Sequence, residues 1–344
     1  MSDENNGERD PMIPNDPNNP YNVIPTVFPN IGTVTKPVVV FFGPRDVGKT
    51  VVLIRLSIYL QNQGVRVEPV EDFRLDERYP SVINSYVNAL RNAHFSPRRT
   101  PNNDCMLLDI HHAGKHICHF LEASGEDFFF HKEPKNEYPN YLNQLFNSKQ
   151  RKVLVFLFSD NMFPRQQGSA NATGDYAKKI SSLLNQGAID PKRDSLIILY
   201  NKVDESKFMQ QGTLNRKDLQ DNFFSRYPIL KSFFYDKGNK YKNTTFVPFS
   251  SGIFSKIEGV DYKAWAHSKD KYPKELWMAI WDFVHLGNNK WGWSDFINKE
   301  ENNNKPNNEN SSPTTHEDKP VISKALGAVV MIIVVAVFFY YAFL

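Results

Sequence analysis

Eight consecutive residues, 43–50, have the types and spacing needed to bind phosphate. Their sequence, GPRDVGKT, matches the pattern G-x-x-x-x-G-K-[ST]. Glycines let backbone N–H groups wrap phosphate oxygens, the Lys49 ammonium neutralises their charge, and the Thr50 hydroxyl is a ligand for Mg²⁺. The segment therefore predicts a phosphate-binding loop. Its expected contact residues are Gly43, Asp46, Val47, Gly48, Lys49 and Thr50.

A second segment, NKVD at residues 201–204, predicts that the bound base is guanine. The Asp204 carboxylate can accept hydrogen bonds from the N1–H and N2–H groups of guanine, and adenine offers no such pair of donors. Asn201 can bond the base edge, and the stem of Lys202 can lie over the ring. A charged turn after a strand would also explain these four residues. Their position downstream of a phosphate-binding loop favours a site for GTP or GDP.

The elements that must position these motifs predict an α/β fold. Short, continuous apolar runs alternate with helix-like stretches, as in a wound parallel sheet. The run 38–42 precedes the loop, and the apolar stretch 50–60 after it predicts a buried helix. A turn at Ala113-Gly114 predicts an antiparallel hairpin. We expect six strands, mostly parallel with one antiparallel edge strand, and a last helix from Pro273 to Gly287. The strands are expected at 38–42, 105–110, 116–121, 152–158, 195–200 and 244–249.

These motifs, in this order over residues 36–290, resemble the Ras-like, translation-factor-related class of P-loop GTPases. The loop GPRDVGKT is also similar to those of the signal-recognition-particle receptor beta subunit and the ADP-ribosylation-factor-like proteins. The resemblance implies GTP or GDP with Mg²⁺ as cofactor. It also implies that Ser250 and Ser251 replace the class's S-A-K element, whose backbone N–H groups contact the guanine carbonyl.

The resemblance further implies a D-x-x-G element after the third strand, where this chain has Glu122-Ala123-Ser124-Gly125. Glutamate replaces aspartate, and its carboxylate is one methylene further out, so it can hold Mg²⁺ through a water molecule. Gly125 is expected to reach the γ-phosphate. Glu126 stands where many members position the attacking water, although an exposed acidic loop residue is an equally good interpretation.

The resemblance also implies a switch threonine just before the hairpin, and Thr100 occupies that place. The predicted Mg²⁺ ligands are therefore Thr50, Thr100 and Glu122. Three arginines could stabilise charge in the transition state of hydrolysis: Arg98, Arg99 and, within the phosphate-binding loop, Arg45. For each of them an ordinary surface charge is the alternative.

The predicted hairpin contains a rival candidate, a cluster of metal-ligating residue types. If strict alternation holds across a two-residue turn, Asp109, His111, His116 and Cys118 share one face. That set could bind zinc. Its spacing matches no standard structural zinc site, and the opposite face already explains the hairpin as a strand pair packed on the core. This core face is expected to contain Met106, Leu108, Ile110, Ile117 and Leu121.

Composition excludes several classes of protein. The chain has 344 residues, of which 40% are apolar, enough for a real core. Its net charge of +3 comes from 41 basic and 38 acidic residues without a dense basic stripe, so we expect no nucleic-acid partner. The two cysteines, Cys105 and Cys118, lie in apolar runs, which fits a reducing compartment.

The sequence divides into four predicted parts. Residues 1–33 are a disordered tail, 34–297 the nucleotide-binding domain, 298–320 a flexible polar linker and 321–344 a membrane anchor. The last 20 residues, Ala325 to Leu344, carry no charge, and a helix of that length is roughly 30 Å long, enough to span a bilayer. We expect a single-pass C-terminal anchor with the domain on the cytosolic side.

The sequence thus predicts a membrane-anchored guanine-nucleotide-binding protein. We expect a slow, Mg²⁺-dependent GTPase that acts as a switch or recruiter for a protein effector. One alternative is a nucleotide-locked scaffold with little or no hydrolysis, and a more remote one is an ATP-using P-loop enzyme.

Overall fold

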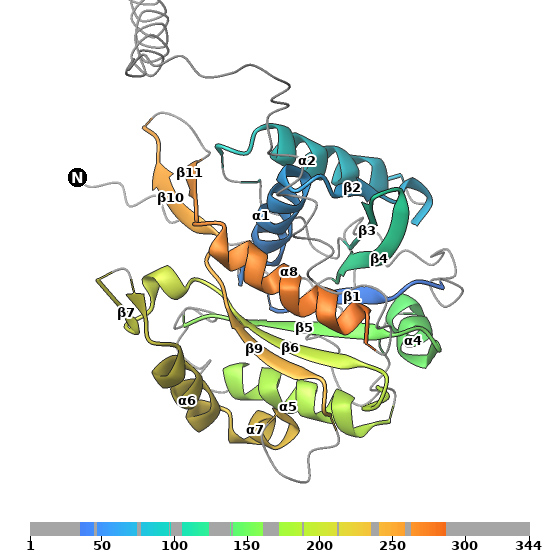
Figure 1. Cartoon of the computed structure of the whole chain (residues 1–344), viewed down its shortest axis with the longest axis vertical. Helices are drawn as coiled ribbons and strands as arrows, with labels where there is room; N and C mark the ends of the chain where they lie inside the picture. Colours follow the sequence, from blue (N-terminus) through green and yellow to red (C-terminus); the bar gives the residue numbers. More distant parts are fainter. Residues whose placement is uncertain are drawn as a thin grey trace, which may run out of the picture. The chain divides into compact units, whose positions relative to one another are not determined.

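A single large sheet forms the centre of the fold in this computed structural model (Figure 1). The structure describes residues 35–44, 47–73, 77–95, 97, 105–123, 138, 140–160, 172–187, 189–211, 213–234, 241–258 and 263–286. The sheet has seven strands in the order β2-β3-β4-β1-β5-β6-β9. Their bounds are β1 Val38–Phe42, β2 Arg66–Pro69, β3 Met106–His112, β4 Lys115–Glu122, β5 Lys152–Phe158, β6 Ser195–Tyr200 and β9 Thr244–Pro248.

The sheet is mostly parallel, as the sequence predicts, but the prediction is wrong at one edge. Strands β4, β1, β5, β6 and β9 run parallel, and β3 is antiparallel to β4. However, β2 pairs with the outer side of β3, with Arg66 opposite His111 and Pro69 opposite Leu108. The sheet therefore has seven strands instead of six, and the antiparallel strand is not at the edge. Strand β2 has only four residues, two of them charged, so no apolar run marks it in the sequence.

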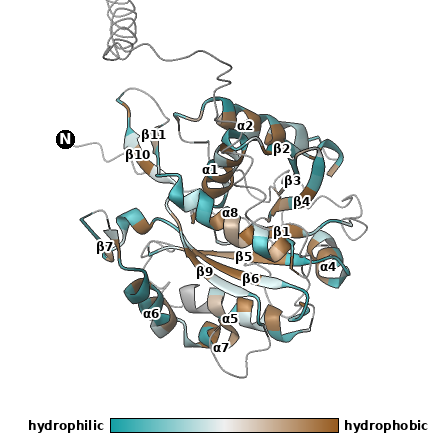
Figure 2. Ribbon diagram, viewed as in Figure 1, coloured by the Kyte–Doolittle hydropathy of each residue, from teal (hydrophilic) through white to brown (hydrophobic). Residues whose placement is uncertain are grey.

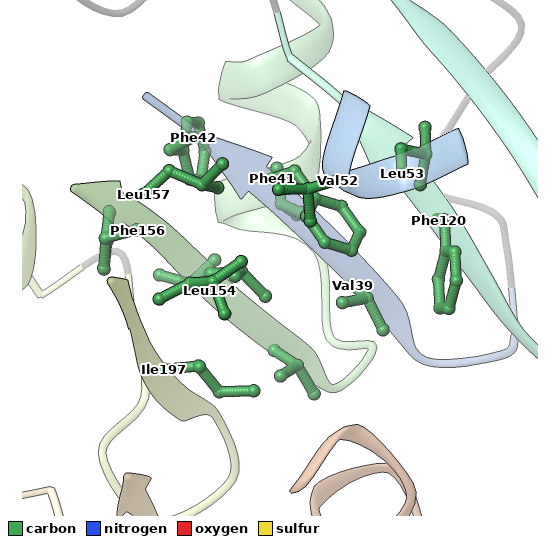
Figure 3. Packing of buried hydrophobic residues seen from close by; sticks show 14 of the residues in the cluster. Val39, Phe41, Phe42, Val52, Leu53, Phe120, Leu154, Phe156, Leu157 and Ile197 are labelled. Carbon is green, nitrogen blue, oxygen red and sulfur yellow. The ribbon is translucent and has the colours of Figure 1, made fainter. Parts of the chain in front are cut away.

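The central strands are buried on both faces because helices cover both sides. Every residue of β1, β5 and β6 is buried, as expected of parallel strands with two covered faces. Figure 2 shows hydrophobic residues concentrated in these strands. In Figure 3, Phe41 of β1 lies beside Val52 of helix α1 (Lys49–Asn62).

Helices α1 and α8 (Lys271–Val284) cover one face of the sheet. Phe120 of β4 packs edge-on against Phe41 of β1, 5.5 Å between ring centroids, and against Trp277 of α8 at 6.2 Å. Helix α8 begins two residues before the predicted Pro273, because proline is tolerated throughout a first turn that needs no N–H donors. Helix α2 (Tyr79–Arg91) joins α1 on its outer side, where the Tyr86 hydroxyl donates to Ser57 Oγ at 2.7 Å.

Other helices cover the opposite face. Phe42 of β1 contacts Phe146 of helix α4 (Asn140–Asn147), and Phe158 of β5 contacts Tyr176 of α5 (Ala172–Asn185). Helix α6 (Arg216–Arg226) also reaches Phe158, through Phe223. Helix α7 (Pro228–Phe234) follows it. The single-turn helices are η2 (Glu71–Phe73) and η3 (Val203–Glu205), and the small hairpins are β7–β8 (Met209–Gln210, Thr213–Leu214) and β10–β11 (Gly252–Lys256, Lys263–His267).

Within the part of the chain that the structure describes, no helix combines the length and apolar character needed to cross a membrane. The predicted tail 1–33, linker 298–320 and anchor 321–344 lie outside the described residues. The anchor and its orientation stay predictions.

Candidate functional site

The predicted phosphate-binding loop joins the end of β1 to the start of α1, the context that the motif requires. Gly48 caps the helix in the left-handed region, with φ 92° and ψ 29°. A Cβ on Gly48 would lie 2.8 Å from Nδ2 of Asn201, and one on Gly43 would lie 2.7 Å from Cγ1 of Val47. Both glycines of the motif are therefore required by close packing, and at Gly48 by backbone conformation as well.

Lys49 lies across this loop at the helix N-terminus. Its Nζ atom donates to the backbone oxygens of Gly43, at 2.8 Å, and Pro44, at 3.2 Å. Gly48 has no side chain to cap the helix, and the first turn of α1 contains no acidic residue. No carboxylate of that turn competes with an anion for the positive end of the helix dipole, so the arrangement suits phosphate.

Thr50 and Glu122 meet beside the loop although 72 residues separate them. Strand β4 pairs with β1 in parallel, with Glu122 opposite Phe41, so the carboxyl ends of the two strands bring the side chains together. The Thr50 hydroxyl donates to Oε1 of Glu122 at 2.5 Å. Glu122 is only 5% exposed. A hydroxyl and a carboxylate are oxygen ligands that Mg²⁺ prefers, so this pair fits the ion. Their role as its ligands stays a prediction.

Asn201 connects the predicted base-binding segment to the phosphate-binding loop. Its side chain is 1% exposed, and Nδ2 donates to the Val47 carbonyl at 2.9 Å. Its backbone N–H donates to Phe158 of β5 at 2.7 Å. The sequence suggested a contact between Asn201 and the base edge. In the structure the amide nitrogen joins the two loops, and the contact of Asn201 with the base edge stays a prediction.

Lys202 and Asp204 follow at the end of β6. Lys202 takes the left-handed conformation, φ 60° and ψ 38°, and caps η3. The chain is pinned there because the buried Val203 donates its N–H to the Phe249 carbonyl at 3.1 Å. Asp204 is half-buried and lies near Tyr272 of α8. Burial and, to a smaller extent, the Asp204 charge raise the pKa of Tyr272 above its ordinary value.

The serines after β9 form a braced loop beside this segment. Ser250 and Ser251 are 2% and 6% exposed. The Ser251 carbonyl accepts from Trp265 Nε1 at 3.0 Å and from the Ser268 N–H at 3.3 Å. Gly252 is held at φ 118°, where a Cβ would lie 2.1 Å from the Ala266 carbonyl oxygen. The β10–β11 hairpin thus fixes the loop.

Arg55 of α1 is a supporting residue that the sequence did not reveal. It is 2% exposed, and its Nη2 atom donates to the Ser268 carbonyl at 2.8 Å and to Oδ1 of Asp270 at 2.5 Å. The helix that begins at the phosphate-binding loop is thereby joined to the segment that braces the serine loop. The partners are 213 and 215 residues away, so no local pattern predicts them.

Seven of the predicted site residues lie outside the described residues, and their roles stay predictions. They are Arg45, Asp46, Arg98, Arg99, Thr100, Gly125 and Glu126.

The predicted face of the histidine-rich hairpin needs a correction. The pairs Ile110–Cys118 and His111–His116 leave Ile117 as an extra residue in β4, a bulge that breaks the expected alternation. Cys118 therefore lies opposite Ile110 on the buried face of the hairpin. Burial raises the pKa of its thiol. His119 takes its place opposite Asp109. Leu121, opposite Leu107, also lies on the face of Asp109 and not on that of Met106.

Comparisons with known proteins yield solved structures only. No protein-family model and no curated protein matches the chain. It is similar to a structure described as nucleolar GTP-binding protein 1 from Plasmodium falciparum, with 11% identity over 81% of this chain and 98% of that chain, TM-score 0.37. The GTP-bound Ski7 GTPase-like domain of S. cerevisiae has 18% identity over 77% of this chain and 53% of that chain, TM-score 0.39.

The signal recognition particle receptor complex SRb-GTP/SRX from Chaetomium thermophilum has 14% identity over 63% of this chain and 91% of that chain, TM-score 0.33. This chain spans about half the length of the Ski7 structure. Such identities and TM-scores assign no activity or partner. The strand order, the loop after β1 and the NKVD segment after β6 are those of a P-loop GTPase fold.

Proposed function

We propose that this protein binds GTP and GDP with Mg²⁺, hydrolyses GTP slowly, and acts as a switch or recruiter of a protein effector at a membrane. The hydrogen bond from Asn201 Nδ2 to the Val47 carbonyl carries the proposal. It joins the segment suited to guanine to the loop suited to phosphate, so the two motifs form parts of one site. Two motifs matched by chance would have no reason to share a buried contact.

The residues around the loop have distinct roles in this proposal. Lys49 and the N–H groups of the α1 N-terminus bind the β- and γ-phosphates. Thr50 and Glu122 hold Mg²⁺, which when bound neutralises phosphate charge. Asp204 reads the guanine N–H donors, and Ser250 and Ser251 border the base. The catalytic roles predicted for Arg45, Arg98, Arg99 and Glu126 belong to the same proposal.

A second candidate, a nucleotide-locked scaffold, is favoured by the direct contact between Glu122 and Thr50. The glutamate carboxylate is one methylene longer than the aspartate of the GTPase class, and it lies 2.5 Å from the Thr50 hydroxyl. A carboxylate held this close to the Thr50 hydroxyl would shift Mg²⁺ from the geometry that hydrolysis needs, so bound GTP would persist. Single-turnover hydrolysis of bound GTP separates the candidates, since the scaffold leaves GTP intact.

Membrane attachment rests on the sequence of residues 325–344, which is long and apolar enough to span a bilayer. Removing these residues should release the protein into the soluble fraction with its GTP affinity unchanged. Protease added outside intact cells should leave the domain uncut. Cleavage within residues 1–320 under these conditions would show that the domain does not face the cytosol.

The base specificity tests the central claim. We expect guanine nucleotide to co-purify with the protein, and GTP to bind much more tightly than ATP in isothermal titration. Asp204→Asn should lower the affinity for GTP and raise that for xanthosine triphosphate, because an amide donates to the xanthine oxygen where a carboxylate cannot. Asp221→Asn, an exposed change on α6, is the control. Equal GTP and ATP affinities would leave an ATP-using enzyme as the better interpretation.

A further inference from the structure

Three histidine rings and one carboxylate gather on the β3–β4 hairpin. Oδ1 of Asp109 lies 2.6 Å from Nδ1 of His119 and 3.6 Å from Nε2 of His116, and Oδ2 lies 4.0 Å from Nε2 of His111. The rings of His111 and His116 stack with centroids 4.7 Å apart, and His116 meets His119 edge-on at 4.4 Å. The nucleotide site uses none of these groups.

The bulge at Ile117 is what assembles this cluster. In regular alternation, residues 116 and 119 of one strand would point to opposite faces of the sheet. With Ile117 as the extra residue, His116 lies opposite His111 and His119 lies opposite Asp109, so all four side chains share a face. Bulges commonly re-aim side chains at functional sites.

We propose that this cluster binds one divalent transition-metal cation of the zinc type. Asp109, His111 and His116 are the ligands, and His119 orients the Asp109 carboxylate. One ligand atom from each of the three lies within 4.8 Å of the others. Two ligands of one zinc ion lie roughly 3 to 4 Å apart, given metal–ligand bonds of about 2 Å. The present separations therefore need only small side-chain rotations.

The donor set selects the class of cation. Imidazole nitrogens with one carboxylate suit zinc and its neighbours, whereas Mg²⁺ and Ca²⁺ take oxygen ligands. Nε2 of His116 also lies 3.2 Å from the Cys118 carbonyl oxygen, so coordination through this atom replaces that hydrogen bond. Three protein ligands leave a fourth position for solvent or for a ligand from a partner.

The protonation states agree with this ligand set. Burial, followed by the charge of His119, lowers the pKa of His116, which favours the neutral imidazole that metals bind. Burial acts to raise the pKa of Asp109, but the neighbouring rings of His119, His116 and His111 lower it overall, which favours the carboxylate. His119 is 7% exposed, and neither of its ring nitrogens forms a hydrogen bond of good geometry with the described residues. Its Nδ1 atom faces the Asp109 carboxylate, where it can orient that group toward a cation.

The cluster is separate from the nucleotide site on the same hairpin. Met106 pairs with Glu122 at the end beside the phosphate-binding loop, whereas His112 pairs with Lys115 at the turn, next to the cluster. The edge strand β2 lies beside β3 (Figure 1) and places Glu68 opposite Asp109 and Arg66 opposite His111. Arg66 and Glu68 form an ion pair with each other at 3.3 Å. Cation binding at the turn can therefore be measured without disturbing nucleotide.

The test is a zinc titration of the full chain in detergent, first stripped with a chelator and then kept in excess Mg²⁺ and GDP. Competition against a chromophoric chelator should show one equivalent of bound Zn²⁺. Bound Co²⁺ should give the visible absorption of a four-coordinate site. His111→Gln should weaken zinc binding on the order of 100-fold, and His119→Gln by about 10- to 100-fold.

His94→Gln, which changes an exposed histidine outside the cluster, is the matched control and should leave the zinc affinity unchanged. Circular dichroism and GDP binding confirm that each variant is folded. Lys49→Ala should retain zinc even if it loses nucleotide, which separates this proposal from the GTP-binding one. The absence of an equivalent of bound zinc, or equal affinities for His111→Gln and His94→Gln, would overturn the metal site.

Discussion

Two lysines at opposite ends of the sheet show how similar contacts serve different purposes. Lys49, after β1, donates to the carbonyls of Gly43 and Pro44 at the carboxyl ends of the strands. Lys152, the first residue of β5, donates to the carbonyls of Ser148, at 2.9 Å, and Gln150, at 3.3 Å. Each ammonium thus bridges two backbone oxygens of a loop.

The difference lies in what the protein places around each charge. Lys152 is fully buried with the equally buried Asp194, 3.6 Å from Nζ. Asp194 also accepts from the N–H groups of Lys152 and Asp190, each at 2.9 Å, and from the guanidinium of Arg193. Lys49 is only partly buried and lies at a helix N-terminus. The fold itself supplies the partners of Lys152, whereas Lys49 lies in the loop where we propose that phosphate binds.

The largest effect should come from breaking the buried pair. Asp194→Ala leaves the Lys152 ammonium buried without its carboxylate and orphans two backbone N–H groups. We expect the free energy of unfolding to fall by about 3–5 kcal/mol. Urea denaturation measures this loss, and Asp221→Ala on exposed α6 should stay within about 0.5 kcal/mol of the wild type. A small loss for Asp194→Ala would mean that the pair is replaceable.

Lys49→Ala should lower the affinity for nucleotide and leave stability nearly unchanged, the opposite of Asp194→Ala. Because the ammonium faces the proposed phosphate site, we expect the affinity for GTP to fall by about 2–5 kcal/mol. The unfolding midpoint of the nucleotide-free protein should hardly change. Isothermal titration measures the first quantity, and Lys231→Ala on α7 is a control of the same charge. Wild-type GTP affinity in Lys49→Ala would refute the assignment of the loop.

Glu122→Asp tests whether the length of this side chain limits GTP hydrolysis at the proposed site, at the carboxyl ends of β1 and β4. Shortening the side chain by one methylene withdraws the carboxylate from Thr50 and leaves more room for Mg²⁺ and a water molecule. We expect single-turnover GTP hydrolysis to become several-fold faster, which corresponds to a barrier lower by roughly 1 kcal/mol, since a tenfold gain corresponds to about 1.4 kcal/mol. Glu71→Asp, exposed in η2, should leave the rate unchanged. An unchanged rate in Glu122→Asp would place Glu122 outside the metal's reach.

The smallest expected effect is a pH dependence of the unfolding free energy, caused by Lys152 at the start of β5. Burial lowers the pKa of Lys152 to about 8, against the opposing influence of Asp194. The unfolded chain, with an ordinary lysine pKa, therefore binds more protons than the folded chain between about pH 8 and 10.5. The Lys152 contribution to stability should rise with pH, on the order of 1 kcal/mol between pH 7 and 9.

This contribution is measured as the difference in unfolding free energy between the wild type and Lys152→Met. Taking the difference cancels the titrating groups that the two proteins share. The wild type should gain on the variant as the pH rises. A difference that is constant from pH 7 to 9 would show that Lys152 keeps an ordinary pKa in the fold.

The parts of the fold that the sequence predicts are those with a local signature. Strands β5 and β6 have the expected bounds because each is an unbroken apolar run. The loop before α1 is marked by its glycines and lysine. By contrast, β2 is too short and too charged to be recognised, and no residue type marks the bulge at Ile117.

The site follows the same rule. Motifs bring Lys49, Thr50 and Asn201 to attention, because their types and spacing are tied to the chemistry of phosphate and guanine. The bond of Asn201 to Val47 and those of Arg55 to Ser268 and Asp270 depend on the packing of distant segments. Such contacts are fixed only once the whole sheet is assembled, so the residues that support the site are the ones that sequence reasoning misses.

The short edge strand has a consequence for association between molecules. An exposed strand edge can pair with a second chain and start aggregation. Here β2 has four residues, has the buried Val67 between the exposed Arg66 and Glu68, and ends at the half-buried Pro69. At the other edge, β9 ends at Pro248. Because proline offers no N–H, each edge strand ends at a residue that cannot donate to a further strand. These features of the two edge strands oppose growth of the sheet by addition of strands from neighbouring copies.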